Sequence, residues 1–282
     1  MIKYHLKLNN KLIDLSTPIV MGIVNLTPDS FFKGSRLTSE SAVLKCVEKI
    51  LENGGTIVDV GAYSTRPGAG MISSEVEIER LSEGVETILR KFPDTIISVD
   101  TFRANVARYM VDNFGVAMIN DVSGGTLDNL MFETIADLNV AYVLMHTRGN
   151  PATMQQLTDY ENVVSEVLHF LEKRLAQLYI LGVIDVLVDP GFGFAKTLEQ
   201  NYRILKKLSY FQELNVPILA GVSRKSMICK ILDTDAENAL NGTTAVNMLA
   251  LMGGASVLRV HDVKEAVETI KIFNQFNQQD LP

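Results

Sequence analysis

One pattern recurs along this chain and constrains its fold more than any other: a short apolar run that stops abruptly at a polar residue. The first example is residues 19–25, Ile-Val-Met-Gly-Ile-Val-Asn, which are followed by the turn-forming sequence Thr27-Pro28-Asp29-Ser30. A continuous run rich in β-branched residues is typical of a strand buried on both faces. The run therefore predicts a buried strand with Asn25 at its carboxyl end, beneath a loop.

The same pattern predicts seven further strands. They lie at residues 56–61, 95–99, 116–119, 140–145, 186–188, 218–220 and 256–258, and each is followed by a loop and a helical pattern. Helix starts are indicated by Thr38-Ser39-Glu40 and Ser73-Ser74-Glu75, which are typical N-terminal sequences. Upstream, residues 2–16 alternate around Asn9-Asn10, which predicts a two-stranded hairpin over one end of the fold.

Eight successive strand–helix units favour one fold class. Continuously apolar strands joined by helices are typical of a parallel sheet, and eight of them favour a closed (β/α)₈ TIM barrel of the α/β class. An open doubly wound sheet is the alternative, but no Gly-rich dinucleotide fingerprint follows the first strand. Since no linker interrupts the units, we expect one domain over residues 1–282, with residues 1–17 as the hairpin.

Composition and charge limit the classes of partner and the compartment that we expect for this chain. A net charge of −7 without any basic run argues against nucleic acid, although a local cationic cluster could still bind an anionic substrate. The first residues lack the apolar core of a signal peptide, and no apolar run reaches the roughly 18 residues that span a membrane. Cys46 and Cys229 lie in helical patterns outside any metal-binding spacing. We therefore expect a cytoplasmic protein with a reduced pair of cysteines.

The predicted strand ends share an unusual chemistry. In a barrel, the carboxyl ends of all strands converge on one mouth, where active sites form. Side chains that can ionise or hydrogen-bond lie at or just after these ends: Asn25, Thr65, Arg66, Asp100, Asn120, Asp121, His146, Asp189, Lys225, Arg259 and His261. Any single one could merely cap a helix or order a turn, a role that fits Asp121 and His146 well. The set as a whole predicts a binding site.

Two halves of the site can be read from these residue types. Arg66, Lys225, Arg259 and His261 favour an anion such as a phosphate. Asn25 alone could hold only a weakly bound Mg²⁺ that also depends on substrate phosphates.

The other half suits a flat nitrogen heterocycle. Asp100, Asn120 and Asp189 offer acceptors and an amide for the donor edge of such a ring, and Met145 and Phe194 could form an apolar slot around it. Together the two halves describe a site for a heterocycle that carries a phosphate or pyrophosphate.

Nine segments in this order resemble the dihydropteroate synthase family of pterin-binding TIM barrels. They are Asn25-Leu-Thr-Pro-Asp-Ser-Phe, Ser64-Thr-Arg-Pro-Gly-Ala, Ser98-Val-Asp-Thr, Ile119-Asn-Asp-Val-Ser-Gly-Gly, Met145-His, Arg148-Gly-Asn-Pro, Asp189-Pro-Gly-Phe-Gly-Phe, Ser223-Arg-Lys-Ser and Arg259-Val-His-Asp-Val. The resemblance covers the chain from about residue 18 to its end. It implies a homodimeric transferase of folate biosynthesis, of the class that sulfonamides target, that joins 6-hydroxymethyl-7,8-dihydropterin diphosphate to 4-aminobenzoate and releases pyrophosphate.

The resemblance also implies residue roles. The implied catalytic set is Asn25, Arg66, Asp100, Lys225, Arg259 and His261, with Asn25 as the Mg²⁺ contact. The implied substrate-binding set is Thr65, Arg66, Asp100, Asn120, Met145, Asp189, Phe194, Ser223, Lys225, Arg259, Val260, His261, Phe31 and Pro67. The chain departs from the family pattern in two loops. The family often has Glu where this chain has Tyr63, and its first loop commonly continues Ser-Phe-x-Asp-Gly-Gly, where this chain has Lys33-Gly34-Ser35 in place of Asp-Gly-Gly.

Ser223 lies just before a predicted helix. Ser223-Arg224-Lys225-Ser226 should open a helix whose first N–H groups have no intrahelical partner. The carboxylate of 4-aminobenzoate could bind there, Ser223 could simply be the N-cap, or both roles could hold together.

Two rival functions remain open from the sequence. A pterin-dependent methyltransferase would use the same barrel but has no need of the Asn25 loop or the Arg259-Val-His pyrophosphate segment. A non-catalytic pterin-binding protein would keep only the pocket.

Overall fold

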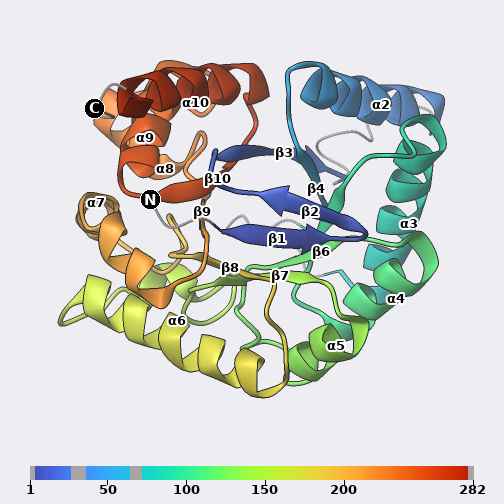
Figure 1. Cartoon of the computed structure of the whole chain (residues 1–282), viewed down its shortest axis with the longest axis horizontal. Helices are drawn as coiled ribbons and strands as arrows, with labels where there is room; N and C mark the ends of the chain where they lie inside the picture. Colours follow the sequence, from blue (N-terminus) through green and yellow to red (C-terminus); the bar gives the residue numbers. More distant parts are fainter. Residues whose placement is uncertain (1–3, 27–35, 64–71, 279–282) are drawn as a thin grey trace.

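The computed structural model describes residues 4–26, 36–63 and 72–278. Eight parallel strands close into a barrel in the order β10-β3-β4-β5-β6-β7-β8-β9, which confirms the predicted (β/α)₈ fold (Figure 1). The strands are β3 (Ile19–Asn25), β4 (Ile57–Gly61), β5 (Ile97–Asp100), β6 (Met118–Asp121), β7 (Ala141–Met145), β8 (Val186–Asp189), β9 (Ile218–Ala220) and β10 (Ala255–Val260). The alternative of an open doubly wound sheet is therefore wrong.

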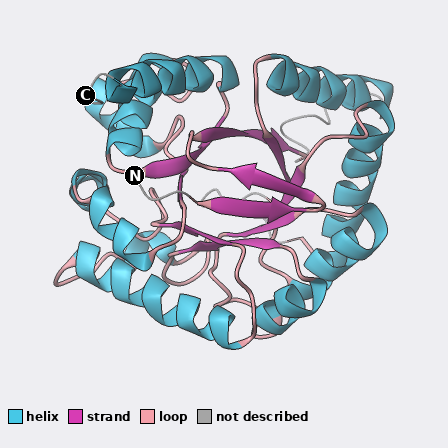
Figure 2. Ribbon diagram, in the orientation of Figure 1, coloured by secondary structure: helices cyan, strands magenta, loops and turns pink. Residues whose placement is uncertain are grey.

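Helices form an outer ring around the barrel (Figure 2). Their bounds are α2 (Arg36–Glu52), α3 (Ser74–Lys91), α4 (Ala104–Phe114), α5 (Met131–Leu138), α6 (Val163–Ile180), α7 (Leu198–Lys206), α8 (Ser226–Leu232), α9 (Leu240–Met252) and α10 (Val263–Gln278). Their ends follow local sequence: Ser73 caps α3 by accepting from Val76 N, and Gly115 ends α4 with a left-handed φ of +63°. None of the helices described is long and apolar enough to cross a lipid bilayer.

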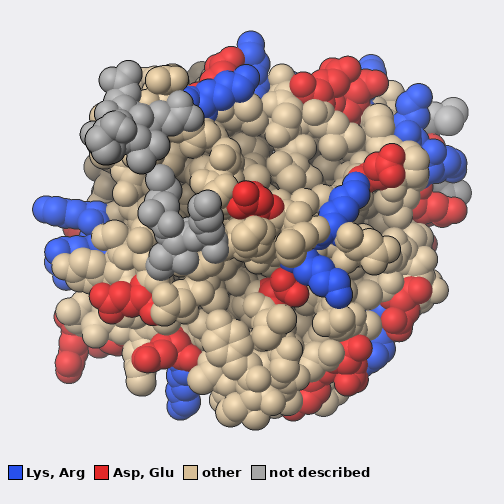
Figure 3. All heavy atoms as spheres, viewed as in Figure 1, with Lys and Arg blue, Asp and Glu red and all other residues tan. Residues whose placement is uncertain are grey.

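The predicted N-terminal hairpin is present and covers the amino-terminal end of the barrel (Figure 1). Strands β1 (His5–Leu8) and β2 (Lys11–Asp14) pair antiparallel, and Asn9 takes a positive φ of +54° in the turn. The buried side chains of Leu6 and Leu8 belong to the apolar cluster inside the barrel. On the face of the molecule shown in Figure 3, basic side chains lie among acidic ones and form no single basic field.

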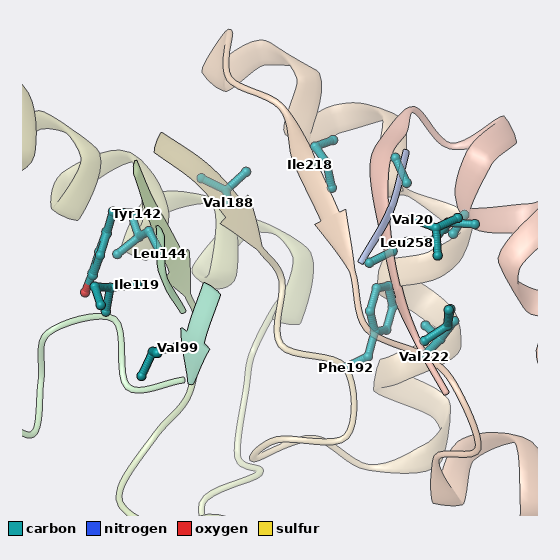
Figure 4. Close-up of a cluster of buried hydrophobic side chains, with 14 of the residues drawn as sticks. Val20, Val99, Ile119, Tyr142, Leu144, Val188, Phe192, Ile218, Val222 and Leu258 are labelled. Atoms are coloured by element: carbon teal, nitrogen blue, oxygen red, sulfur yellow. The ribbon is translucent and has the colours of Figure 1, made fainter. Parts of the chain in front are cut away.

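Strand residues divide between two apolar layers because successive side chains point to opposite faces. Outward-facing side chains pack against the helices. Figure 4 shows part of this outer layer, with the strand residues Val20, Val99, Ile119, Tyr142, Leu144, Val188, Ile218 and Leu258 beside Phe192 and Val222 from the segments that follow β8 and β9. Inward-facing side chains fill the amino-terminal half of the barrel: Met21, Ile57, Met118, Val143, Leu187, Leu219 and Val257.

The inward face changes character two residues further along several strands. The pairs of apolar and polar residues are Ile57 and Asp59, Met118 and Asn120, Leu187 and Asp189, and Val257 and Arg259. A residue two positions later lies on the same face and nearer the carboxyl end. The alternation that fills the bottom of the barrel with hydrocarbon therefore brings these polar groups into its mouth.

Candidate active site

Arg259 lies at the centre of this polar layer. Its Nε donates to Asp59 Oδ2 at 2.6 Å and its Nη2 donates to Asp100 Oδ2 at 2.8 Å. Burial alone would lower the pKa of the guanidinium, but the two carboxylates raise it above its ordinary value. Burial raises the pKa of Asp100 to about 7, although Arg259 acts in the opposite direction. The site therefore combines a permanent cation with a carboxyl that can exchange a proton near neutral pH.

Asp59 is a residue that the sequence prediction missed. It is fully buried inside β4, and its Oδ2 also accepts from Asn120 Nδ2 at 3.0 Å. The available signal was a single carboxylate in an otherwise apolar strand. Only the alternation of side chains could show that this carboxylate faces the barrel interior with the predicted site residues.

Asp189 and Lys225 form the opposite side of the layer. Asp189 Oδ1 accepts from Gly191 N at 2.7 Å, and Lys225 Nζ donates to Phe192 O at 2.5 Å. Burial raises the pKa of Asp189 and lowers that of Lys225 to about 8, while the attraction between the two groups opposes both shifts. A Cβ added to Gly221 would lie 3.7 Å from both Asp189 Oδ2 and Lys225 Nζ. Glycine at this position keeps the space between the two groups open.

Apolar side chains border the same space. Met145 is buried and pairs in register with Asp189, while the half-buried ring of Phe194 has Lys225 Nζ 4.8 Å from its centroid. Val260 differs from these residues, because its buried side chain belongs to the outer layer against the helices. The structure therefore does not bring the Val260 side chain to the other predicted site residues.

His261 and Ser223 meet at the rim. Ser223 Oγ lies 3.1 Å from His261 Nδ1 and accepts from His261 N at 3.2 Å. Desolvation by the surrounding protein and the positive charge of Arg259 lower the pKa of His261. Beside them, Arg224 makes a two-pronged pair with Asp262, with Nε–Oδ2 at 2.8 Å and Nη2–Oδ1 at 2.6 Å. This pair holds the Ser223–Lys225 segment against the end of β10, and the sequence prediction did not assign it.

The helix after Ser223 starts later than predicted. Helix α8 begins at Ser226 with Lys225 as its N-cap, and no side chain caps it. Arg224 takes a positive φ of +56°, so the chain turns between Ser223 and the helix. The alternative in which Ser223 is the N-cap is therefore wrong.

Two strand-end residues lie outside this group, as the alternative structural reading suggested. Asp121 accepts from Ser123 N and Gly125 N at 2.7 Å each and from Tyr142 Oη at 2.6 Å, which orders the turn after β6. His146 Nδ1 lies 3.0 Å from the buried Lys196 Nζ, which also donates to Gly191 O at 2.9 Å. Burial lowers the pKa of Lys196 to about 7. The sequence prediction did not single out Lys196.

The remaining predicted residues have mixed positions. Asn25 ends β3 and pairs in register with Gly61, next to Asp100 on β5. Phe31, Thr65, Arg66 and Pro67 lie outside the described residues. Across the described parts of the chain, no group of three or more His, Cys, Asp or Glu side chains could hold a metal ion.

Of the two departures from the family pattern, Lys33-Gly34-Ser35 lies outside the described residues, and Tyr63 packs against an aromatic neighbour. Its ring lies edge-on to Phe102 with centroids 5.3 Å apart, and the guanidinium of Arg103 lies 5.5 Å from the Tyr63 ring. Arg103 also forms an ion pair with the buried Glu77. Tyr63 therefore lies in a structural cluster beside the mouth.

Sequence comparison identifies the family and the proteins to which this chain is similar. The family described as pterin binding enzyme matches residues 21–261. Dihydropteroate synthase from Haemophilus influenzae is 41% identical over 267 residues, which cover 94% of this chain and 96% of that protein. The Escherichia coli K12 enzyme of the same name is 40% identical over 262 residues, covering 92% of each chain.

Solved structures of dihydropteroate synthases are similar to this chain over nearly its whole length. A Yersinia pestis dihydropteroate synthase in a sulfonamide drug complex has a TM-score of 0.90 at 35% identity and covers 98% of this chain and 100% of its own. The Xanthomonas albilineans enzyme with 4-aminobenzoic acid has a TM-score of 0.90 at 36% identity, with full coverage of both chains. The chain belongs to the dihydropteroate synthase family, transferases of folate biosynthesis that condense 6-hydroxymethyl-7,8-dihydropterin diphosphate with 4-aminobenzoate and release pyrophosphate.

Proposed function

We propose that the polar layer at the barrel mouth divides this reaction between a pterin subsite and a pyrophosphate subsite. The observation that supports the division is that acceptors and cations lie on facing strands: Asn120 and Asp189 on β6 and β8, and Arg259 on β10. Buried acceptors suit the ring donors of a pterin, and a guanidinium suits the oxygens of a diphosphate.

In the pterin subsite, Asp189 accepts from ring N–H groups. Its Oδ1 already accepts from Gly191 N, which fixes the carboxylate plane and leaves Oδ2 facing the space beside Gly221. Lys225 covers that space, and its contact with Phe192 O holds the amine in place. Met145 and Phe194 supply apolar contact to the ring, and Asn120 supplies an amide at its other edge.

In the pyrophosphate subsite, the Nη groups of Arg259 and the ring of His261 bind the leaving diphosphate group. Asp100 occupies Nη2 of Arg259 in the structure described here, so the diphosphate replaces one anion with another. Before substrate binds, His261 is uncharged because its pKa is lowered. A diphosphate bound beside it favours its protonation. Arg66 adds a further cation from the second loop, and Thr65 lies beside it in sequence.

The bond that breaks joins the pterin methylene carbon to the diphosphate oxygen, and its electron pair leaves with pyrophosphate. The electron-rich dihydropterin spreads the resulting positive charge over its ring. The amine of 4-aminobenzoate then forms the new C–N bond with its lone pair and loses a proton. No enzyme nucleophile is required, so the protein acts by orienting the ring and by stabilising the departing anion.

The 4-aminobenzoate pocket involves Ser223 and the two loops that contain Phe31 and Pro67. Ser223 Oγ is already oriented by His261 N. A sulfonamide resembles 4-aminobenzoate in shape and should compete with it, in keeping with the sulfonamide complex of the Yersinia pestis relative.

Asn25 fits a Mg²⁺ contact in its donor chemistry. Its amide oxygen is a hard neutral ligand at the carboxyl end of β3, and a single such ligand suits an ion that depends mainly on the diphosphate. When bound, Mg²⁺ would supply charge stabilisation to pyrophosphate oxygens. Pyrophosphate binding measured by calorimetry with and without Mg²⁺ tests this assignment: Asn25→Ala should remove most of the Mg²⁺-dependent gain, and an undiminished gain would contradict it.

The family resemblance also supports a cytoplasmic homodimer. Helices α9 and α10 expose large apolar side chains at helical spacing, Leu249 and Met252 on one and Ile272 and Phe276 on the other. Side chains of this kind are typical of a subunit interface. Sedimentation of the purified chain should give the mass of two copies.

One assay separates this function from its rivals. The chain is incubated with 6-hydroxymethyl-7,8-dihydropterin diphosphate, 4-aminobenzoate and Mg²⁺, and 7,8-dihydropteroate and pyrophosphate are measured. Equal amounts of both products support the proposal. Pterin binding without turnover would indicate a non-catalytic protein, and methyl transfer instead of condensation would indicate a methyltransferase.

A further inference from the structure

Asp59 belongs to the polar layer at the barrel mouth, but its side chain is closed off from solvent. It is fully buried in the middle of β4, with no exposed surface for a substrate to contact. Any effect of this carboxylate on the reaction must therefore pass through the residues it contacts.

Those contacts cross the barrel. Oδ2 of Asp59 accepts from Arg259 Nε on β10 at 2.6 Å and from Asn120 Nδ2 on β6 at 3.0 Å. Strands β10 and β6 each lie two positions away from β4, on opposite sides, in the barrel order. One carboxylate oxygen thus joins a cation of the pyrophosphate subsite to an amide of the pterin subsite.

From these contacts we propose that Asp59 is a positioning residue that sets the orientation of both Arg259 and Asn120 before substrate binds. The inference rests on the roles proposed above for those two residues and adds a third residue that acts through them.

For Arg259, the contact at Nε fixes the deep edge of the guanidinium. The outer edge carries Nη2, whose present partner is Asp100. A diphosphate can displace Asp100 from Nη2 while Asp59 keeps Nε, so the cation need not reorient during binding. A group that is already in place costs no reorganisation when charge develops on the leaving oxygen.

For Asn120, the contact fixes which way the amide faces. An ionised carboxylate only accepts hydrogen bonds, so the amide nitrogen of Asn120 must face Asp59. Its Oδ1 is then turned away from Asp59 as an acceptor for a ring donor. Asp59 therefore also sets the hydrogen-bonding pattern that the pterin meets.

Asp59→Asn is the sharpest test, because it keeps the shape of the side chain and removes its charge. The Michaelis constant for the pterin diphosphate should rise about 10- to 100-fold, as expected for loss of charge-assisted hydrogen bonds. The constant for 4-aminobenzoate should stay unchanged. By calorimetry, inorganic pyrophosphate and 6-hydroxymethylpterin should each bind more weakly.

Asp121→Asn is the matched control. Asp121 is also fully buried near the end of a barrel strand, but it bonds Ser123, Gly125 and Tyr142 rather than Arg259 or Asn120. This variant should lower the melting temperature without changing either Michaelis constant. An Arg259→Lys background adds a further check, because Asp59→Asn should weaken pyrophosphate binding much less there than in the wild type.

The wild type gives a second measurement that does not depend on folding of a variant. With ¹⁵N-labelled arginine, the Nε–H signal of Arg259, assigned by its loss in Arg259→Lys, should stay protected from solvent exchange when pyrophosphate is added. Rapid exchange of that Nε–H in the complex would overturn the proposal. So would Asp59→Asn if it only lowered the melting temperature, as the control does.

These outcomes remain distinct from failure of the proposed function. If the wild type forms no 7,8-dihydropteroate, the proposed function is wrong, while the calorimetric and exchange measurements still decide the role of Asp59. If the wild type is active and Asp59→Asn retains both Michaelis constants, only the role of Asp59 is wrong.

Discussion

The two ends of the barrel interior are built from the same strands, but one end is apolar and stabilises the fold, while the other is polar and forms the candidate site. At the amino-terminal end, Met21, Leu187 and Val257 meet Leu6 and Leu8 of the hairpin in a closed apolar cluster. Two residues further along, β8 and β10 present Asp189 and Arg259 instead. Removal of hydrocarbon from water in the lower, amino-terminal layer stabilises the folded protein. The upper layer holds buried charges, which persist only because each has a partner.

This contrast shows how a rigid site can tolerate costly groups. Asp100, the last residue of β5, pairs in register with Asn120, the residue before the last of β6, so the ladder fixes their backbones. The strands are in turn held by the apolar layers inside and outside the barrel. Stability is concentrated where no substrate reaches, and the charged groups depend on it.

Strand β8 offers the most direct way to break the comparison, because one substitution can be made in each layer. Leu187→Ala removes a fully buried side chain from the lower layer, and we expect it to lower the free energy of unfolding by about 2–5 kcal/mol. Affinity for 6-hydroxymethylpterin should be unchanged in the folded enzyme. Chemical denaturation and calorimetry measure the two quantities, and a large loss of affinity would show that the layers are not separable.

Asp189→Asn is the partner substitution, two residues later on the same face. Ring donors that lose the carboxylate are left poorly paired, so pterin binding should weaken by about 1–3 kcal/mol. The burial of Asp189, which raises the pKa of its carboxyl and disfavours the charge, means that the variant should unfold no more easily than the wild type. Wild-type pterin affinity in Asp189→Asn would remove Asp189 from the pterin subsite.

How far the sequence predicted these layers depends on the residue. All eight strands were predicted because each is a separate apolar run, and their polar ends indicated the mouth. Asp59 was missed because it lies inside a run rather than at its end. Val260 was included with Arg259 and His261 as one segment, although neighbouring strand residues face opposite sides.

Tertiary contacts explain the other differences. Ser223 looked like a helix cap, but Arg224 adopts a positive φ and pairs with Asp262, 38 residues away in sequence. The contact between Lys196 and His146 likewise joins two separate loops. Local sequence does not encode such pairs, so only the assembled barrel shows them.

The pH dependence of stability sharpens the comparison further. The pKa of Asp100 is raised in the folded protein, first by burial, from 3.8 to about 7. A carboxyl whose folded pKa is raised binds a proton more tightly when folded, so its contribution is fully present below pH 3.8 and is lost as pH rises through about 7. Asp100→Asn should therefore flatten the decline in melting temperature over this range. An identical decline in wild type and variant would show that Asp100 titrates normally.

Ser223→Ala should have the smallest effect, because it tests the rim rather than either layer. Ser223 Oγ accepts from His261 N at 3.2 Å, and this contact leaves the hydroxyl hydrogen free to serve the carboxylate of 4-aminobenzoate or the ring of His261. Loss of one hydrogen bond of this kind costs about 0.5–1.5 kcal/mol. The Michaelis constant for 4-aminobenzoate should rise by the corresponding few-fold factor, while that for the pterin diphosphate stays close to the wild-type value. A sulfonamide should lose affinity in parallel with 4-aminobenzoate. If the pterin diphosphate constant rises instead, Ser223 acts through His261 on the pyrophosphate subsite, and the rim belongs functionally to the charged layer below it.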